Sequence, residues 1–234
     1  MAYYYGERGG GFWQRMPKVT KHIIVINFIM FVATLINGNF MVATFGLFYP
    51  TSQFFRVWQP LTYMFMHGGF WHIFFNMYTL LIFGTVVERT IGMKKFLVFY
   101  LVAGLGAAAT HLAVQYAEMV AITDRIVEGV SAASSSYANL LRTPTVGASG
   151  AIYGLLIGYA MLYPNSVLTL LFPPVSMKAK WFVLIFAGIE LVTGVTGTIG
   201  GVAHFAHLGG ALFGWLLMLW WKRSGRIYRQ DEWI

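Results

Sequence analysis

Long apolar stretches alternate with short polar connections along the whole chain. Six of these stretches approach the length of roughly 20 residues that an α-helix needs to cross the hydrocarbon core of a bilayer. They cover approximately residues 22–44, 70–88, 95–117, 146–163, 181–198 and 202–221. The pattern therefore predicts an all-α membrane protein with six transmembrane helices in one domain, residues 22–221.

The composition agrees with a membrane location. Of the 234 residues, 58% are hydrophobic and 10% are charged, whereas soluble domains carry about 25% charged residues. The chain therefore has too little polar surface to cover a soluble globule. It contains no cysteine, which excludes disulfides, thiol nucleophiles and cysteine metal sites.

The positive charges are unevenly distributed between the connections. The formal net charge of +8 could indicate a nucleic-acid partner, but 13 of the 16 lysines and arginines lie in the two terminal segments or in the connections after the second and fourth spans. Only Arg56, Arg125 and Arg142 lie in the alternate connections. The positive-inside rule therefore predicts two cytoplasmic tails, residues 1–21 and 222–234. With this explanation of the charge, we expect no nucleic-acid partner.

The N-terminal segment predicts where the protein is located. Basic residues precede the first apolar stretch, and no small-residue cleavage site follows it, so we expect an uncleaved first span and not a signal peptide. The compact core and the expected lack of a transit peptide favour a bacterial cytoplasmic membrane.

Small residues recur every four positions in the fourth and sixth predicted spans. The fourth span carries Gly150, Gly154 and Gly158, and the sixth carries Ala203, Ala211 and Gly214. Close backbone approach between small residues stabilises helix pairs in lipid. We therefore expect these two spans to pack against each other.

Polar side chains lie near the outer ends of three spans. If both termini are cytoplasmic, the second, fourth and sixth spans all enter the membrane from the outer face. His72 and Asn76 lie in the second span, Ser149 at the start of the fourth and His207 in the sixth. At roughly 1.5 Å per residue, all four lie on the order of 5 to 12 Å below the outer surface. We expect them to form one layer.

Each of these residues also has a structural explanation. A serine can cap a helix, a buried histidine can simply be hydrogen-bonded, and His72 and Asn76, four residues apart, could form an interhelical hydrogen-bond pair. Together, however, they supply the groups that acyl transfer needs: a nucleophilic Ser149 with His207 as its base, and His72, Asn76 and the Ser149 backbone N–H as oxyanion donors. Because no Asp or Glu is expected at this depth, we predict a dyad.

Tyr153 lies one helical turn after Ser149 on the same predicted helix face. Its ring could stack on His207 and fix the imidazole. It could equally be a packed aromatic side chain whose hydroxyl is hydrogen-bonded elsewhere, and the sequence favours neither.

Glu190 lies near the middle of the fifth predicted span, deeper than the layer of Ser149. Burying a carboxylate there costs roughly 2.5 to 3.5 kcal/mol, so we expect it to be protonated or hydrogen-bonded and not catalytic. It is the main support for an alternative function, a small transporter or proton relay. The lack of an evident inverted repeat argues against that alternative.

His204 lies one turn before His207 and could form a metal-binding pair with it. Since the chain has no cysteine and no carboxylate is expected nearby, we predict no metal site and no cofactor.

Three motifs occur on three of the predicted spans: Gly147-Ala148-Ser149-Gly150, the pair His72 and Asn76, and the run 206–210 (AHLGG) followed by Gly214. With these motifs in this order, the chain resembles the rhomboid family of intramembrane serine proteases over approximately residues 20–222. The resemblance implies a six-helix rhomboid-like bundle in the lipid bilayer. It also implies hydrolysis of peptide bonds in the transmembrane segments of other membrane proteins.

The resemblance also implies roles for individual residues. It assigns Ser149 as nucleophile and His207 as general base, and it implies that Tyr153 stacks on that histidine. The implied oxyanion environment consists of His72, Asn76, Gly147 and Ser149. The implied supporting residues are His67, which orders the first loop, and Gly210 and Gly214, which form the close-packed face of the last helix. A catalytically inactive relative that binds membrane segments is the alternative, against which the presence of both Ser149 and His207 argues.

The chain departs from the family pattern at two places. Trp58 is followed by Gln59 where rhomboids usually carry arginine, which puts the anchoring of the aromatic-rich connection 45–69 in question. That connection is either an interfacial aromatic belt or a half-submerged structured loop. The outer segment 118–144 is longer than the family core needs, and we expect it to be solvated and mobile.

Overall fold

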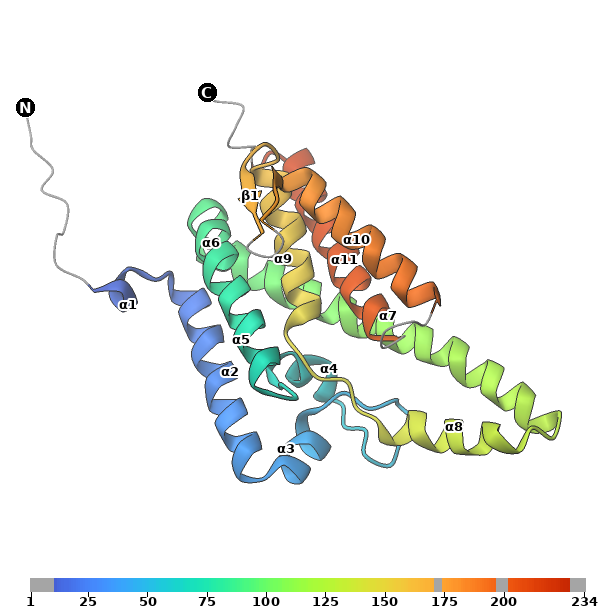
Figure 1. Cartoon of the computed structure of the whole chain (residues 1–234). Coiled ribbons are helices and arrows are strands. Elements are labelled where there is room, and N and C mark those ends of the chain that lie inside the picture. The colour runs from blue at the N-terminus through green and yellow to red at the C-terminus, as the bar shows by residue number, and fades with distance from the viewer. Residues whose placement is uncertain (1–10, 171–173, 197–201, 228–234) are drawn as a thin grey trace, which may run out of the picture.

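A computed structural model describes residues 11–170, 174–196 and 202–227 of the chain. The helices in chain order are α1 (Phe12–Arg15), α2 (Lys18–Ile36), α3 (Gly38–Phe45), α4 (Gln59–Thr62), α5 (Phe70–Thr79), α6 (Thr85–Ile91), α7 (Met93–Val127), α8 (Ser131–Arg142), α9 (Ser149–Leu162), α10 (Ala179–Thr196) and α11 (Val202–Arg223). A 3-10 turn, η1 (Tyr63–Phe65), follows α4, and a π-helical turn, η2 (Leu80–Gly84), joins α5 to α6. Two short antiparallel strands, β1 (Val167–Thr169) and β2 (Ser176–Lys178), lie between α9 and α10 (Figure 1).

Within the described ranges, five helical segments are long and apolar enough to cross a membrane: α2, the segment 70–91, α7, α10 and α11. Helix α9 is apolar but has only 14 residues. These helices coincide with the six predicted apolar stretches, so the all-α membrane fold class is confirmed. The cytoplasmic orientation of both ends and the division into tails and core stay predictions. Residues 1–10 and 228–234 of the predicted tails lie outside the described residues.

The centre of the bundle consists of α7, α9 and α11. Its side chains include fully buried Phe96 and Tyr100 of α7, Leu155 of α9 and Met218 of α11. Helices α2, α5 and α6 lie on one side of this centre, and α10 lies on the other, against α9 and α11 (Figure 1).

Glycines bring α9 and α11 into backbone contact, as the small-residue pattern predicts. A Cβ added at Gly210 would lie 1.9 Å from the carbonyl oxygen of Gly150, and one added at Gly214 would lie 2.8 Å from the Cα of Gly154. No side chain of any size fits into such gaps. The prediction for Gly158 is wrong, because a Cβ there would meet the ring of Phe99 on α7, at 2.7 Å, and not α11.

A buried carboxylate joins the first span to the second. Glu88 of α6 is 4% exposed and accepts hydrogen bonds from the backbone N–H of Val19 at 2.9 Å and of Thr20 at 2.7 Å. The Thr20 hydroxyl donates to it as well, at 2.8 Å. These N–H groups belong to the first turn of α2, where a helix has no internal acceptors and favours a negative charge. Glu88 therefore caps α2 from a neighbouring helix.

The connection 45–69 is a structured loop, and its depth in the membrane stays a prediction. Gln59 is fully buried and takes over the anchoring. Its amide donates to the carbonyls of Phe54 at 2.9 Å and Ala43 at 3.2 Å, and its side-chain oxygen accepts from the N–H of Phe48 at 3.3 Å. A neutral amide thus binds two points of the loop and the last turn of α3.

The outer segment 118–144 is helical. Helix α7 continues to Val127 and α8 returns against it, and most of the side chains of this segment are exposed, as expected. Its mobility stays a prediction. The end of α8 contacts the first loop, where the Ser52 hydroxyl donates to the carbonyl of Leu141 at 2.6 Å.

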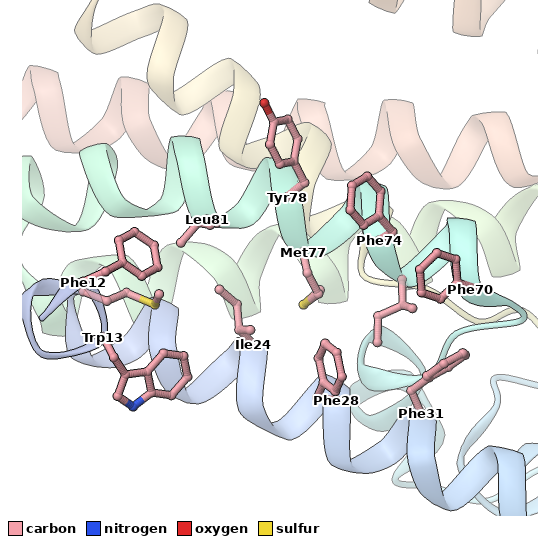
Figure 2. A pocket seen from close by; sticks show the side chains of 12 residues that line it. Phe12, Trp13, Ile24, Phe28, Phe31, Phe70, Phe74, Met77, Tyr78 and Leu81 are labelled. Carbon is pink, nitrogen blue, oxygen red and sulfur yellow. The ribbon is translucent and has the colours of Figure 1, made fainter.

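An apolar groove of about 350 Å³ separates α2 from α5 (Figure 2). Aromatic and aliphatic side chains line it, among them Trp13, Phe28, Phe74 and Tyr78. Phe28 and Phe74 are 57% and 44% exposed. Such a surface is typical of a helix pair that faces hydrocarbon.

Candidate active site

Ser149 is the first residue of α9, and the loop before it is fixed at three points. Thr145 pairs with Leu47 through two backbone hydrogen bonds of 2.8 and 2.9 Å, and the N–H of Gly147 donates to the carbonyl of Tyr63 at 3.0 Å. Gly147 has a φ of +135°, a conformation that favours glycine. A Cβ there would also lie 2.8 Å from Nε2 of His72. Glycine at this position therefore allows the His72 ring to approach the start of α9.

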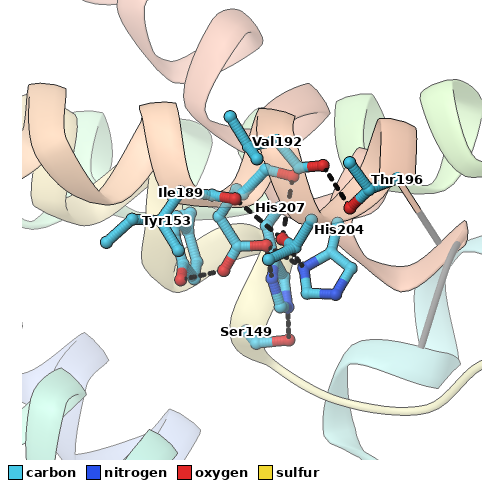
Figure 3. A network of polar contacts seen from close by, with 9 residues as sticks. Ser149, Tyr153, Ile189, Val192, Thr196, His204 and His207 are labelled. Carbon is cyan, nitrogen blue, oxygen red and sulfur yellow. Dashed lines mark hydrogen bonds and ion pairs between the residues drawn. The ribbon is translucent and has the colours of Figure 1, made fainter. Parts of the chain in front are cut away.

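His207 of α11 faces Ser149 across the close contact between the two helices (Figure 3). Its Nε2 lies 2.8 Å from the Ser149 hydroxyl oxygen. The ring of Tyr153 lies parallel to the imidazole, with 4.4 Å between centroids and 4° between planes, which is the stacking that the sequence left open. An unprotonated Nε2 at this distance can accept the serine proton.

Glu190 lies beside the same imidazole, and one prediction about it is wrong. Its Oε2 is 3.1 Å from Nδ1 of His207, so a carboxylate does accompany the serine and the histidine. Because Glu190 has these partners, it is not an isolated midplane carboxylate, and the transporter alternative loses its main support.

Two further groups hold the Glu190 carboxylate, which is 8% exposed. The Tyr153 hydroxyl donates to Oε1. Nδ1 of His204 lies 2.5 Å from Oε2 and 3.2 Å from the Thr193 hydroxyl. Two features of the sequence indicated this cluster: an ionisable residue in the fifth predicted span and a second histidine one turn before His207.

Glu190, His204 and His207 each offer a metal-ligand atom, and these atoms lie within 4.8 Å of one another. The expectation that no carboxylate accompanies the two histidines is therefore wrong. However, Oε2 of Glu190 and Nδ1 of His204 are only 2.5 Å apart, whereas two ligands of a tetrahedral zinc ion lie roughly 3.3 Å apart. The cluster is arranged for hydrogen bonding and would have to open to admit a metal ion.

The two residues of α5 lie differently with respect to Ser149. The His72 ring points toward Gly147, and its Nδ1 accepts from the N–H of Gly68 at 3.4 Å. The Asn76 amide donates to the carbonyl of His72 at 2.9 Å, within its own helix. His72 is thus placed beside the start of α9, while the Asn76 amide group makes a local contact.

His67 packs edge-on against His72, with ring centroids 4.9 Å apart. It is 2% exposed, and neither ring nitrogen has a hydrogen-bond partner among the described residues. Burial, and to a smaller extent the neighbouring His72, lowers the pKa of His67 to about 3. The His67 ring is therefore neutral, and it packs against the ring of His72.

Comparison with known proteins gives a consistent result. A family model described as Rhomboid domain matches residues 55–223. The chain is 29% identical over 211 residues to RHOMBOID-like protein 12, mitochondrial, of Arabidopsis thaliana, covering 89% of this chain and 60% of that protein. It is 29% identical over 169 residues to Rhomboid protease AarA of Providencia stuartii (69% and 55%) and 26% identical over 212 residues to Rhomboid protease GlpG of Pectobacterium atrosepticum (88% and 64%). The chain thus spans less than two thirds of the length of these relatives.

Proposed function

The chain belongs to the rhomboid family, and we propose that it is an intramembrane serine endopeptidase that cleaves transmembrane segments of other membrane proteins. The observation that carries this proposal is the 2.8 Å contact between Ser149 and Nε2 of His207, made across two helices in backbone contact. Two of the similar proteins are named rhomboid proteases.

In the proposed reaction, Nε2 of His207 takes the hydroxyl proton as Ser149 attacks the scissile carbonyl carbon. His207 then protonates the leaving amine, which breaks the carbon–nitrogen bond and leaves an acyl-enzyme. A water molecule, deprotonated by the same nitrogen, hydrolyses that ester and regenerates Ser149. Activity should therefore fall at acidic pH, because protonated His207 cannot accept the serine proton.

The developing oxyanion would be stabilised by groups around Gly147. The Ser149 N–H lies at the positive end of the α9 dipole, and His72 reaches the same region past Gly147, which has no side chain. Asn76 would contribute only after its amide turns from the carbonyl of His72 toward the substrate. We assign it to the same oxyanion environment on this condition. We assign supporting roles to Tyr153, His67, Gly210 and Gly214.

The length of α9 supports a site inside the bilayer. Its 14 residues span about 21 Å, against roughly 30 Å of hydrocarbon. If its C-terminal end lies at the cytoplasmic surface, Ser149 lies below the outer one, where a transmembrane segment can reach it. We propose residues 22–221 as the protease domain, residues 1–21 and 222–234 as cytoplasmic tails, and a bacterial cytoplasmic membrane as its location.

The test uses the full chain in liposomes with a single-span model substrate and a fluorophosphonate probe. We expect the wild type to cleave and to be labelled, and Ser149→Ala and His207→Ala each to lower cleavage by at least about 1,000-fold. Ser135→Ala, which removes an exposed serine of α8, is the matched control and should keep full activity. Cleavage that survives in Ser149→Ala would disprove the proposal. A folded wild type that neither cleaves nor labels would instead identify an inactive relative.

A further inference from the structure

We infer that Glu190 is a positioning residue for His207, so that the site works as a Ser149–His207–Glu190 triad and not as a dyad. This inference rests on the proposed protease function. Glu190 acts through the imidazole and does not contact the substrate.

The first support is the placement of the two imidazole nitrogens. Nε2 of His207 lies 2.8 Å from the Ser149 hydroxyl oxygen, while Nδ1, across the ring, lies 3.1 Å from Oε2 of Glu190. For Nε2 to accept the serine proton, the neutral ring must carry its own proton on Nδ1. A carboxylate beside Nδ1 favours that tautomer and stabilises the imidazolium that forms during attack.

The contact between Nδ1 of His207 and Glu190 is short but is not a hydrogen bond of regular geometry. The Nδ1 atom is buried and makes no hydrogen bond of regular geometry within the described residues. The 3.1 Å contact with Glu190 is therefore an electrostatic one in this state. Catalytic hydrogen bonds are often poorly aligned before a substrate binds and tighten when it does.

The second support is how the carboxylate itself is held. The Tyr153 hydroxyl donates to Oε1, and His204 lies 2.5 Å from Oε2. Tyr153 thus contacts both Glu190, through its hydroxyl, and His207, through its stacked ring. A carboxylate that is 8% exposed in an apolar helix is costly unless it is paired. Here its partners are the proposed base and the two residues that surround that base.

The titratable groups that face His207 come from three other helices as well as its own. They are Glu190 of α10, Tyr153 of α9, His72 of α5 and His204 of α11. Glu190 is the only acidic one in this set. Its removal should therefore change the response of the site to protons more than removal of any of the others.

The test measures kcat, KM and the pH–rate profile of the full chain in liposomes for Glu190→Gln, Glu190→Asp and Glu190→Ala. We expect Glu190→Gln to lower kcat by roughly 10- to 1,000-fold with KM within about twofold. The acid limb of its profile should move to lower pH, because His207 becomes harder to protonate without the negative charge. Glu190→Asp should recover part of kcat. Glu118→Gln, on the exposed surface of α7, is the matched carboxylate control.

Three results would overturn the triad. The first is a Glu190→Gln enzyme with wild-type kcat and an unmoved acid limb, while Ser149→Ala is inactive; that leaves a dyad and keeps the proposed function. The second is a loss of kcat that only follows a loss of thermal stability, again with an unmoved acid limb, which makes Glu190 a helix-packing residue. The third is inactivation by a chelator that zinc reverses, which would favour a metal site. Cleavage by Ser149→Ala would instead sink the proposed function itself.

Discussion

Two interfaces surround the site: α9 packs against α11, and α10 packs against both of these helices. The two are built in opposite ways. Between α9 and α11, glycines bring the backbones into contact, and a Cβ at Gly210 would lie 1.9 Å from the Gly150 carbonyl oxygen. Helix α10, in contrast, is largely exposed: 11% of the residues in its apolar stretch are buried, against 44% in that of α7. A Cβ added at Gly188 of α10 would meet nothing within 4 Å. Ser149 and His207 lie on the first interface, and Glu190 lies on the second.

This difference separates two requirements of a catalytic site. The close glycine contact fixes the distance between Ser149 and His207 by steric exclusion, which leaves little freedom. Polar contacts from Glu190 to Tyr153, His204 and His207 attach α10 at the site, so the position of α10 there depends on the partners of a single carboxylate. The Ser149–His207 distance should therefore tolerate movement of α10, while the contact with Glu190 should not.

The largest expected effect comes from replacing Gly210 by leucine. The side chain cannot fit against the Gly150 backbone, so α11 must move away from α9 or the chain must fail to fold, at a cost of about 3 kcal/mol or more. We expect loss of cleavage and a large decrease in the melting temperature in detergent. Gly188→Leu is the matched control and should leave both unchanged. Equal damage from the two substitutions would contradict the contrast between the interfaces.

A smaller loss is expected when the carboxylate that holds α2 is neutralised. Glu88 accepts three hydrogen bonds from the first turn of α2, and each hydrogen bond to a charged group contributes about 1.5 to 3 kcal/mol. Glu88→Gln keeps part of them, so we expect a decrease of about 2 kcal/mol in the free energy of unfolding. The kcat of the folded fraction should not change, because Glu88 does not contact the site. Glu128→Gln, on an exposed carboxylate, should have no effect on either quantity.

The sequence predicted the packed interface better than the polar one. Spacing of small residues identified the α9–α11 contact at Gly150, Gly154 and Gly214, because backbone approach depends on residue size alone. Depth counted along ideal helices could not show that the Glu190 carboxylate reaches His207, because a side chain of several ångströms bridges adjacent layers. The sequence could also not show that Gln59 anchors the first loop where rhomboids usually carry arginine. Its anchoring role depends on backbone groups of a loop that folds around it.

Acidification should lower the free energy of unfolding to a moderate extent through His67, whose ring packs against His72. The pKa of His67 is lowered to about 3 in the folded protein, against roughly 6.5 when unfolded. Between these pH values only the unfolded state binds the proton. The contribution of neutral His67 to the free energy of unfolding is therefore complete above pH 6.5 and decreases as the pH falls. The expected loss is about 1 kcal/mol at pH 5.5.

Unfolding in detergent between pH 7.5 and 5 measures this loss. His67→Phe cannot titrate and should show a smaller decrease with pH. His22→Phe, which removes an exposed histidine of α2, should behave as the wild type does. The same pH dependence in all three proteins would rule out the assignment to His67.

The smallest effect tests the single hydroxyl that links the two interfaces. Tyr153→Phe keeps the ring stacked on His207 but removes the donor to Oε1 of Glu190. A hydrogen bond to a charged group contributes about 1.5 kcal/mol. Because His204 still holds the carboxylate, we expect about half of this to reach the rate, so kcat should fall roughly 3-fold with little change in stability. Tyr159→Phe, one and a half turns further along α9 with its ring against Phe83, is the control for hydroxyl removal.

The combination of Tyr153→Phe with Glu190→Gln shows whether this hydroxyl acts through the carboxylate. If it does, the double variant should be no slower than Glu190→Gln alone, because the hydroxyl then has no charge to hold. Multiplicative losses would mean that Tyr153 acts on His207 directly. In that case the rigid interface would orient the base without help from α10.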